Sequence, residues 1–166
     1  MRFTDIVASD LPEIQERSGA IGIRAVYLAP TVPLYFSSAD SEKLRWAAKK
    51  APLLIRSARL EPDTAFLREV AANNKILEIP LDGLMRSRGA QRAALIGRLR
   101  QFLALSIKYR ADFMLCTRAQ SVYDLRTPHE LMAVGQLLGL TRAQAERAIS
   151  AVPDSLMEAI ERSHQH

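Results

Sequence analysis

The chain has 166 residues, of which 48% are hydrophobic and 25% charged, and these proportions are typical of a globular domain and exclude a largely disordered chain. A chain of this length fits one domain, so we expect residues 1–166 to form a single unit. The net charge is +5, and eighteen arginines accompany five lysines. This excess favours a nucleic-acid partner because guanidinium groups match the geometry of phosphates, although a genome that favours arginine codons gives the same excess.

Short apolar runs alternate with helical patterns along the chain, which favours βαβ units and a mainly parallel sheet. The predicted strands span residues 3–8, 23–28, 53–60, 75–81 and 112–117. The helices predicted among them span residues 10–17, 40–50, 63–73 and 90–108. We expect Asp10 to cap the first helix, Pro30 and Pro33 to end the second strand, and residues 82–89 to form a polar, basic loop.

The remaining sequence predicts helices only. Residues 127–130 combine an N-cap threonine, a proline at the first helical position and a capping-box glutamate, and this helix is expected to end near Gly139. A second capping box at residues 141–144 opens the next helix, and the last helix is expected to begin at Pro153. The predicted fold class is therefore α/β, with about five parallel strands and a helical C-terminus.

The single cysteine, Cys116, excludes an internal disulfide and fits a reducing compartment. It lies in an apolar run, so we interpret it as a buried structural thiol rather than a nucleophile. The first five residues carry charges where a signal peptide needs an apolar stretch, and no apolar run approaches the roughly 20 residues that cross a bilayer. We therefore expect a cytoplasmic protein with no membrane partner.

Residues that could activate water for hydrolysis are scarce. Histidine occurs three times; two of these residues lie at the C-terminal end, and His129 falls in a capping box, where we expect it to be solvated. The carboxylates of Asp5, Glu78 and Asp82 are scattered along the sequence. No phosphate-binding glycine loop or catalytic triad pattern is present. We therefore predict no catalytic residue, no metal site and no cofactor.

The arginines fall where a parallel barrel places its functional residues, which is the face formed by the C-terminal ends of the strands and the loops after them. We expect this face to carry Arg56, Arg59, Arg86, Arg88, Arg92, Arg118 and Arg126. Converging guanidinium groups would bind phosphates, whereas the alternative is a solvated loop face. Because aromatic residues make up only 6% of the chain, we expect recognition of folded RNA through its backbone and shape rather than stacking on unpaired bases.

Residues 131–149 offer a competing interpretation, a DNA-reading helix-turn-helix in which a Leu-Gly-Leu-Thr turn precedes a capped second helix. Glu146 lies among the exposed positions of that second helix, which counts against a surface that contacts DNA phosphates. We prefer an ordinary helical hairpin packed on the sheet.

Three segments within residues 74–155 carry a resemblance to a known family. The first is the strand 76–81 with the polar loop after it and Arg92 at the start of a long helix. The second is the run 115–120, Leu-Cys-Thr-Arg-Ala-Gln, at the end of the last strand. The third is the run 124–131, Asp-Leu-Arg-Thr-Pro-His-Glu-Leu, and the glycine- and leucine-containing helix after it. Together they cover about half of the chain and resemble protein component 3 of archaeal ribonuclease P, whose eukaryotic counterpart is the thirty-kilodalton subunit.

The resemblance implies a barrel related to the PHP phosphoesterases but without their metal centre. It also implies pairing with ribonuclease P protein component 2 and binding to the catalytic half of the ribonuclease P RNA. In that assembly the RNA cleaves the 5′ leader from precursor tRNA, and the protein stabilises the active shape of the RNA. The chain would then be noncatalytic by itself and would meet precursor tRNA only through the holoenzyme.

The sequence departs from the family pattern in two ways. Asp82 stands where family members tend to have arginine, and roughly two βα units of the family barrel are expected to be missing between the third strand and Lys75. An open barrel leaves strand edges and an apolar interior, and we expect a partner subunit or self-association into a homo-oligomer to cover them.

We therefore expect a shortened TIM-like barrel that serves as an RNA-binding subunit of ribonuclease P. The alternatives are a helix-turn-helix DNA-binding regulator and an uncharacterised α/β hydrolase.

Overall fold

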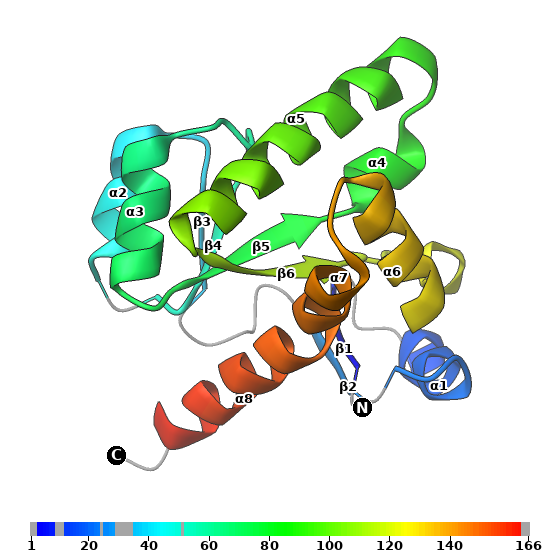
Figure 1. Cartoon of the computed structure of the whole chain (residues 1–166). Coiled ribbons are helices and arrows are strands. Elements are labelled where there is room, and N and C mark those ends of the chain that lie inside the picture. The colour runs from blue at the N-terminus through cyan, green and yellow to red at the C-terminus, as the bar shows by residue number, and fades with distance from the viewer. Residues whose placement is uncertain (1–2, 9–11, 24, 29–34, 51, 164–166) are drawn as a thin grey trace.

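Strands and helices alternate along the chain in the computed structural model, which describes residues 3–8, 12–23, 25–28, 35–50 and 52–163 (Figure 1). The strands are Thr4–Val7 (β1), Ala25–Leu28 (β2), Tyr35–Ser38 (β3), Leu54–Ser57 (β4), Ile76–Pro80 (β5) and Asp112–Cys116 (β6). The helices are Pro12–Ala20 (α1), Ser41–Ala48 (α2), Thr64–Ala72 (α3), Asp82–Arg86 (α4), Gly89–Tyr109 (α5), Pro128–Leu137 (α6), Arg142–Ile149 (α7) and Ala151–Ser163 (α8). A 3-10 turn, Val122–Asp124 (η2), follows β6.

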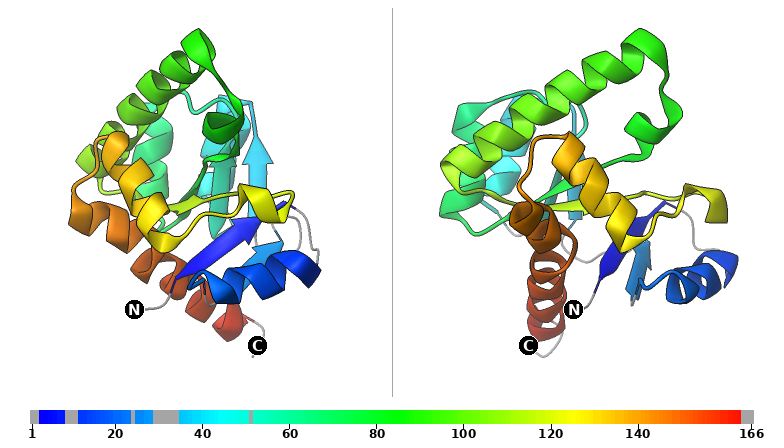
Figure 2. Two further views of the ribbon diagram at one scale, coloured as in Figure 1. Left: turned by 90° about the vertical axis from the view of Figure 1, so that its right-hand side faces the viewer. Right: turned by 45° about the vertical axis from the view of Figure 1, so that its right-hand side comes forward.

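All strand pairs in the described residues are parallel, and they form a four-stranded sheet in the order β3-β4-β5-β6 and a pair β1-β2. The two parts join where the chain leaves β6, because the amide of Arg118 donates to the carbonyl of Ile6 (2.9 Å) and the amide of Ala8 to that of Ala119 (2.9 Å). The result is a curved, open series of strands (Figure 2), which confirms the predicted partial TIM-like barrel.

The described residues contain one strand more than the five located from the sequence, because β3 was not expected. This strand, Tyr-Phe-Ser-Ser, is only partly buried and lies at the edge of the sheet, so it lacks the continuous apolar run of a central strand. The strand pairing also differs from the prediction that two βα units are missing between the third predicted strand, which is β4, and Lys75. β4 pairs directly with β5 through a crossover that contains α3, whereas the described residues show no pairing between β2 and β3.

Local capping signals locate several helices as predicted. The carboxylates of Asp40 and Asp63 accept amide hydrogen bonds at the starts of α2 and α3, and capping boxes at Thr127 and Thr141 open α6 and α7. The segment 82–89 is not the loop that was expected, because its first five residues form α4. The predicted roles of Asp10, Pro30 and Pro33 lie outside the described residues.

Two apolar layers cover the two faces of the sheet. On one face, side chains of β4, β5 and β6 pack against α2, α3, α5, α6 and α7 in the main core. On the other face lies α8, which Figures 1 and 2 show on the side of the sheet opposite α5. Its residues Val152, Leu156 and Ile160 pack in one cluster with Ile6, Leu54, Ile76, Met114 and Cys116.

The expectation that a partner or a second copy covers the barrel interior is therefore wrong for this inner face, which the chain's own last helix fills. The hairpin of α6 and α7 packs on the sheet through Gly135 and Ala145. This confirms the helical hairpin over a free DNA-reading motif.

Candidate nucleic-acid interface

Three of the strands lead at their C-terminal ends into segments that carry basic side chains. α4 follows β5, the η2 segment follows β6, and α1 follows β1 (Figure 1). Of the seven predicted arginines, Arg56 lies within β4, Arg59 follows it, Arg86, Arg88 and Arg92 lie on or beside α4 and the start of α5, and Arg118 and Arg126 follow β6.

A buried carboxylate organises the mouth of the open barrel. The side chain of Glu78 on β5 is fully buried and accepts hydrogen bonds from Arg118 Nη1 (2.9 Å) and from the Tyr35 hydroxyl (2.8 Å). Arg118 reaches it from a left-handed backbone conformation with a φ of 49°, which costs free energy in a residue other than glycine. Only 15% of the Arg118 side chain is exposed. This arginine therefore neutralises a buried charge, and little of its guanidinium group faces solvent.

Arg56 and Asp5 complete the polar interior of the mouth. Arg56 is partly buried, and its Nε atom is buried without a hydrogen-bond partner in the described part of the chain. Asp5 accepts hydrogen bonds from the Thr117 amide (2.8 Å) and hydroxyl (2.5 Å). Burial, together with the nearby charge of Glu78, raises the pKa of Asp5 from its usual 3.8 to about 6. Burial also raises the pKa of the Cys116 thiol well above its usual value, as expected for a structural cysteine.

The arginines around α4 are accessible. Arg86 pairs with Asp124 of η2 (3.2 Å), and 44% of its side chain is exposed. Arg88 is exposed at the N-cap position of α5. Arg92, also exposed, donates from Nε to the carbonyl of Ser87 (2.7 Å), so its position is explained by the end of α4 rather than by an ion pair with Asp82. We call these three exposed arginines, at the end of α4 and the start of α5, the basic patch.

The remaining two predicted arginines, Arg59 and Arg126, have different surroundings. Arg59 is 65% exposed and pairs weakly with Glu61 (3.7 Å). Arg126 donates from Nη1 to the carbonyls of Tyr123 (2.8 Å) and Leu125 (2.6 Å), so its guanidinium group is held against the η2 segment.

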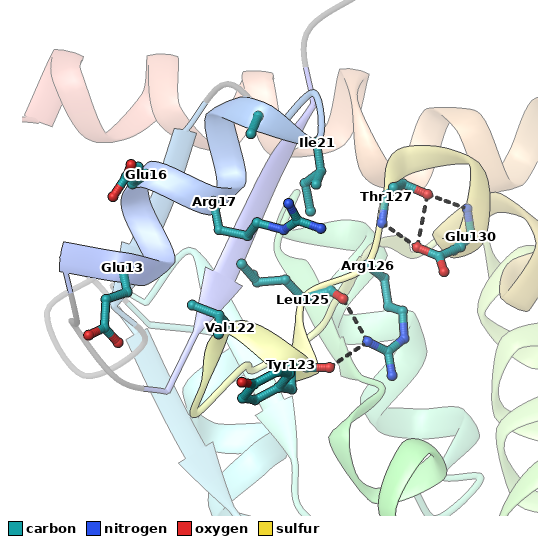
Figure 3. Close-up of a pocket in the computed structure, with 11 residues that line it drawn as sticks. Glu13, Glu16, Arg17, Ile21, Val122, Tyr123, Leu125, Arg126, Thr127 and Glu130 are labelled. Atoms are coloured by element: carbon teal, nitrogen blue, oxygen red, sulfur yellow. Dashed lines mark hydrogen bonds between the residues drawn. The ribbon is translucent and has the colours of Figure 1, made fainter.

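A groove of about 660 Å³ lies between α1 and the segment after β6. Figure 3 shows Arg17 extending from α1 into the space between the two segments, with Tyr123 and Arg126 on the opposite wall. The residues that line it are Glu13, Glu16, Arg17, Ala20, Ile21, Val122, Tyr123, Leu125, Arg126, Thr127 and Glu130.

The seven arginines therefore do not form one uniform surface. The Arg86–Asp124 pair joins the basic patch to the η2 segment that holds Arg126, whereas Arg118 pairs with the buried Glu78 and the Nε atom of Arg56 is itself buried. Sequence reasoning missed Tyr35, Arg17 and Tyr123, and it considered Glu78 only as one of three scattered carboxylates and not as the partner of Arg118. A charged residue inside the apolar run Ile-Leu-Glu-Ile was the available signal for Glu78.

No group of three or more metal-ligating side chains occurs within the described ranges. Asp5 and Glu78, which the sequence left scattered, are both buried near the mouth, and each is hydrogen-bonded by other side chains. His129 is exposed on the first turn of α6, as expected. Among the described helices, none has the length and apolarity needed to cross a bilayer.

The proteins that resemble this chain in sequence carry the same name. A protein named ribonuclease P protein component 3 from Methanothermobacter thermautotrophicus is 35% identical over 91 residues, which is 55% of this chain and 37% of the relative. A protein of the same name from Methanosarcina acetivorans is 36% identical over 106 residues, which is 64% of this chain and 44% of the relative. The chain thus matches about two fifths of the length of these relatives.

The fold has a counterpart among solved structures. A chain in the cryo-EM structure of archaeal ribonuclease P with mature tRNA superposes with a TM-score of 0.72 at 13% sequence identity, covering 98% of this chain and 83% of the other. At this identity the likeness concerns the fold alone. The sequence profile of the RNase P subunit p30 family matches residues 55–165, which include β5, α4, α5, β6 and the helices after them. The chain therefore belongs to the RNase P subunit p30 family.

Proposed function

We propose that the protein is a noncatalytic subunit of ribonuclease P that binds and stabilises the catalytic RNA for 5′ maturation of precursor tRNA. The observation that carries the proposal is the match of the family profile to the part of the chain that builds the basic strand-end face. Relatives that carry the name of this ribonuclease P component, and a similar fold in a ribonuclease P assembly, add support.

The proposal includes partners and a compartment. We propose the ribonuclease P RNA and protein component 2 as direct partners, precursor tRNA as a partner through the holoenzyme, and the cytoplasm as the place of action. Self-association into a homo-oligomer stays a secondary proposal, because α8 already covers the inner face of the barrel; the edge strand β3, with its exposed neighbour Trp46, is where a further chain could pair.

The basic patch should act on phosphates and not on base identity. Arg88 and Arg86 are exposed cations, and each phosphate contact that is lost should weaken RNA binding and lower the slope of log affinity against log salt by about 0.7–0.9. The experiment is to titrate ribonuclease P RNA at several salt concentrations with wild-type protein, Arg88→Ala and Arg86→Ala. Lys50→Ala is the matched control, because Lys50 is an exposed cation at the other end of the strands.

Unchanged affinity and slope in both arginine variants, with folding intact, would place the RNA face elsewhere. If the wild-type protein does not bind ribonuclease P RNA, with or without protein component 2, the proposed function itself fails.

The chain alone should not cleave RNA. The carboxylates of Asp5 and Glu78, the two that are buried in the described residues, are each hydrogen-bonded within the protein, so neither is free to activate water. The test is to incubate the protein with precursor tRNA and Mg²⁺ or Mn²⁺ in the absence of ribonuclease P RNA. Leader cleavage that follows the protein through purification and is abolished in Glu78→Gln would contradict the proposal.

A further inference from the structure

A second groove runs along the seam between α5 and the hairpin of α6 and α7, and we call it the seam groove. Its larger part has a volume of about 550 Å³ and its smaller part about 170 Å³. Ile107 of α5 and Gln144 of α7 line both parts, so the two are continuous. Both views of Figure 2 show the connection between α6 and α7 beside α5.

The floor of the seam groove is apolar. Leu103 and Ile107 line its larger part from α5, and Leu138 and Leu140 line it from the connection between α6 and α7. Leu137, which directly precedes this connection, is a large apolar side chain that is 51% exposed. Apolar surface that is continuous with a groove is typical of a site that binds another molecule.

The polar side chains around this floor are mainly hydrogen-bond donors. Arg100 donates from Nε (3.0 Å) and Nη2 (2.8 Å) to the carbonyl of Leu137, and so ties α5 to the end of α6. The side-chain oxygen of Gln144 accepts from the Thr141 amide (2.9 Å), and its amide nitrogen has no partner among the described residues. Arg110 is exposed and takes part in none of the ion pairs of the described ranges.

Positive charge dominates the lining. Three arginines, Arg100, Arg110 and Arg147, stand against one carboxylate, that of Asp112, which gives a net charge of +2. Asp112 is itself paired with Arg147 (2.6 Å). Glu146 lies on the other side of α7, because it is two residues from the lining residue before it and from the one after it, and helical positions two apart differ in direction by about 200°.

An amphipathic helix edged with carboxylates matches this combination. The larger part of the groove is bordered by α5 and the connection between α6 and α7, neither of which offers a strand edge, so an incoming segment binds there through its side chains. Arg100 and Arg110 are ten residues apart along α5, so the seam is about 15 Å long, which is nearly three helical turns. An apolar stripe of the segment would cover the floor, and carboxylates beside the stripe would meet the arginines.

Two other occupants fit the seam groove less well. The aromatic residue that lines it, Phe113, is buried, so an RNA base has no exposed ring to stack on, and an apolar floor gives phosphates nothing to bind. A second copy of the chain would bring its own net charge of +5 toward the same cations.

We propose that the seam groove is the surface that binds the partner protein subunit, by receiving an amphipathic helix that carries carboxylates beside its apolar stripe. The inference rests on the proposed function, in which protein component 2 is a direct partner. It adds the surface used for that pairing and the chemistry of the segment that occupies it.

The test measures the affinity of purified protein component 2 for wild-type protein and for variants by isothermal titration calorimetry. Ala104 lines the groove and is exposed, so Ala104→Trp places a ring over the floor without entering the core. It should weaken binding roughly 30-fold or more, the loss expected at the centre of an interface. Ala94→Trp is the matched control, an exposed alanine of the same helix that does not line the groove, and should bind as the wild type does.

Charge provides a second readout. Arg110→Glu should weaken the binding of component 2 by about tenfold at low salt, mainly through slower association, and the difference should shrink as salt is added. Arg110→Lys keeps the charge and should retain the affinity. Lys50→Glu makes the same change of net charge at an exposed position outside the groove and should have little effect. Thermal unfolding verifies that each variant is folded.

Photo-crosslinking identifies the occupant. With p-benzoylphenylalanine in place of Ala104, the captured segment of component 2 should have apolar residues at helical spacing and Asp or Glu beside them. Capture of a basic segment, or of none, would contradict the inference.

The outcomes separate this inference from the proposed function. If component 2 binds Ala104→Trp and Arg110→Glu as tightly as the wild type, the seam groove is not its site, whereas the proposed pairing stands. If Ala104→Trp loses ribonuclease P RNA rather than component 2, the groove is an RNA site and the inference is overturned. Self-association of the wild type that Ala104→Trp abolishes, with component 2 still bound, would assign the groove to a second copy. If the wild type binds RNA but not component 2, the pairing and this inference fall together and the RNA-binding function remains.

Discussion

At the residue scale, the buried carboxylate of Glu78 connects three distant parts of the chain. Its partners Tyr35 and Arg118 come from 43 residues before it and 40 residues after it. Glu78→Ala should lower the free energy of unfolding by about 3–5 kcal/mol, because it leaves Arg118 and the Tyr35 hydroxyl unpaired in a dry site. Glu61→Ala, which removes an exposed partner of Arg59, should cost less than about 1 kcal/mol. Urea unfolding of the two variants measures the difference, and equal losses would mean that the buried pair is not a structural contact.

Asp5 gives a prediction for pH, because burial raises its pKa to about 6 from the usual 3.8. The folded protein then binds this proton more tightly than the unfolded chain does, so the contribution of Asp5 to stability is present below about pH 4 and is lost as the pH rises through 6. The free energy of unfolding of the wild type, relative to that of Asp5→Asn, should fall by roughly 2–3 kcal/mol between pH 4 and pH 7.

Asp63 is the control for this titration, and its expected sign is opposite. Partial burial opposes the shift, but amide hydrogen bonds from the first turn of α3 and the charge of Arg45 lower the pKa of Asp63. Its contribution is therefore present at neutral pH and lost as the pH falls through the lowered pKa, so Asp63→Asn should differ most from the wild type near neutrality. Parallel pH profiles for Asp5→Asn and Asp63→Asn would refute the assignment of Asp5.

The sequence predicts the location of a residue where the fold class alone determines it, as it does for residues that directly follow a strand. The arginines after β5 and β6 lie at the strand-end face because all parallel strands end on the same side of the sheet. That Arg118 turns into the barrel could not be predicted, because it depends on a left-handed backbone and on Glu78. The groove at Tyr123 is formed by α1 and a segment about 100 residues later, and local patterns carry no information on that contact.

At the scale of elements, capping and periodicity predicted the long helices, whereas β3 and α4 were missed. β3 reads Tyr-Phe-Ser-Ser, so it lacks the apolar run that marks the other four-residue strands, and α4, with five residues, is too short for a helical periodicity. The packing of α6 depends on a residue whose role the sequence does not show. A Cβ atom at Gly135 would lie 2.9 Å from the Cβ of Ala145 and 3.1 Å from a methyl group of Leu115, so α6 approaches α7 and β6 too closely for any side chain.

Two helical glycines should therefore respond oppositely to the same change. Gly97→Ala in α5 introduces a methyl group with no neighbour within 4 Å, and it should stabilise the protein by about 0.5–1 kcal/mol through helix propensity. Gly135→Ala gains the same propensity but must push α6 from α7, and we expect a net loss of about 1–3 kcal/mol. Thermal and urea unfolding compare the pair. Adding Ala145→Gly should restore part of the loss, and a stabilised Gly135→Ala would show that the two helices do not pack this closely.

At the scale of the whole molecule, the open barrel covers its inner face with its own last helix. Predicting this from the sequence was not possible, because the amphipathic pattern of α8 shows that it has a buried face but does not identify the surface that receives it. The order of the strands explains the arrangement. β6 and β1 meet through the segment after β6, and the chain returns through α6 and α7 to the opposite side, where Val152 and Leu156 meet the inward-facing residues of four strands.

Leu156 tests whether α8 is an integral part of this molecule. It is fully buried with Ile6, Leu54 and Met114, so Leu156→Ala should lower the free energy of unfolding by about 2–5 kcal/mol through lost burial and a residual cavity. Glu158→Ala, an exposed position on the same helix, should change it by less than about 0.5 kcal/mol. Because the apolar face beneath α8 would become accessible, Leu156→Ala should also bind an apolar fluorescent dye and self-associate at micromolar concentration, as measured by light scattering. A protein that keeps its stability and stays monodisperse after this change would show that the inner face is covered by something other than α8, and would restore a partner or a second copy to that role.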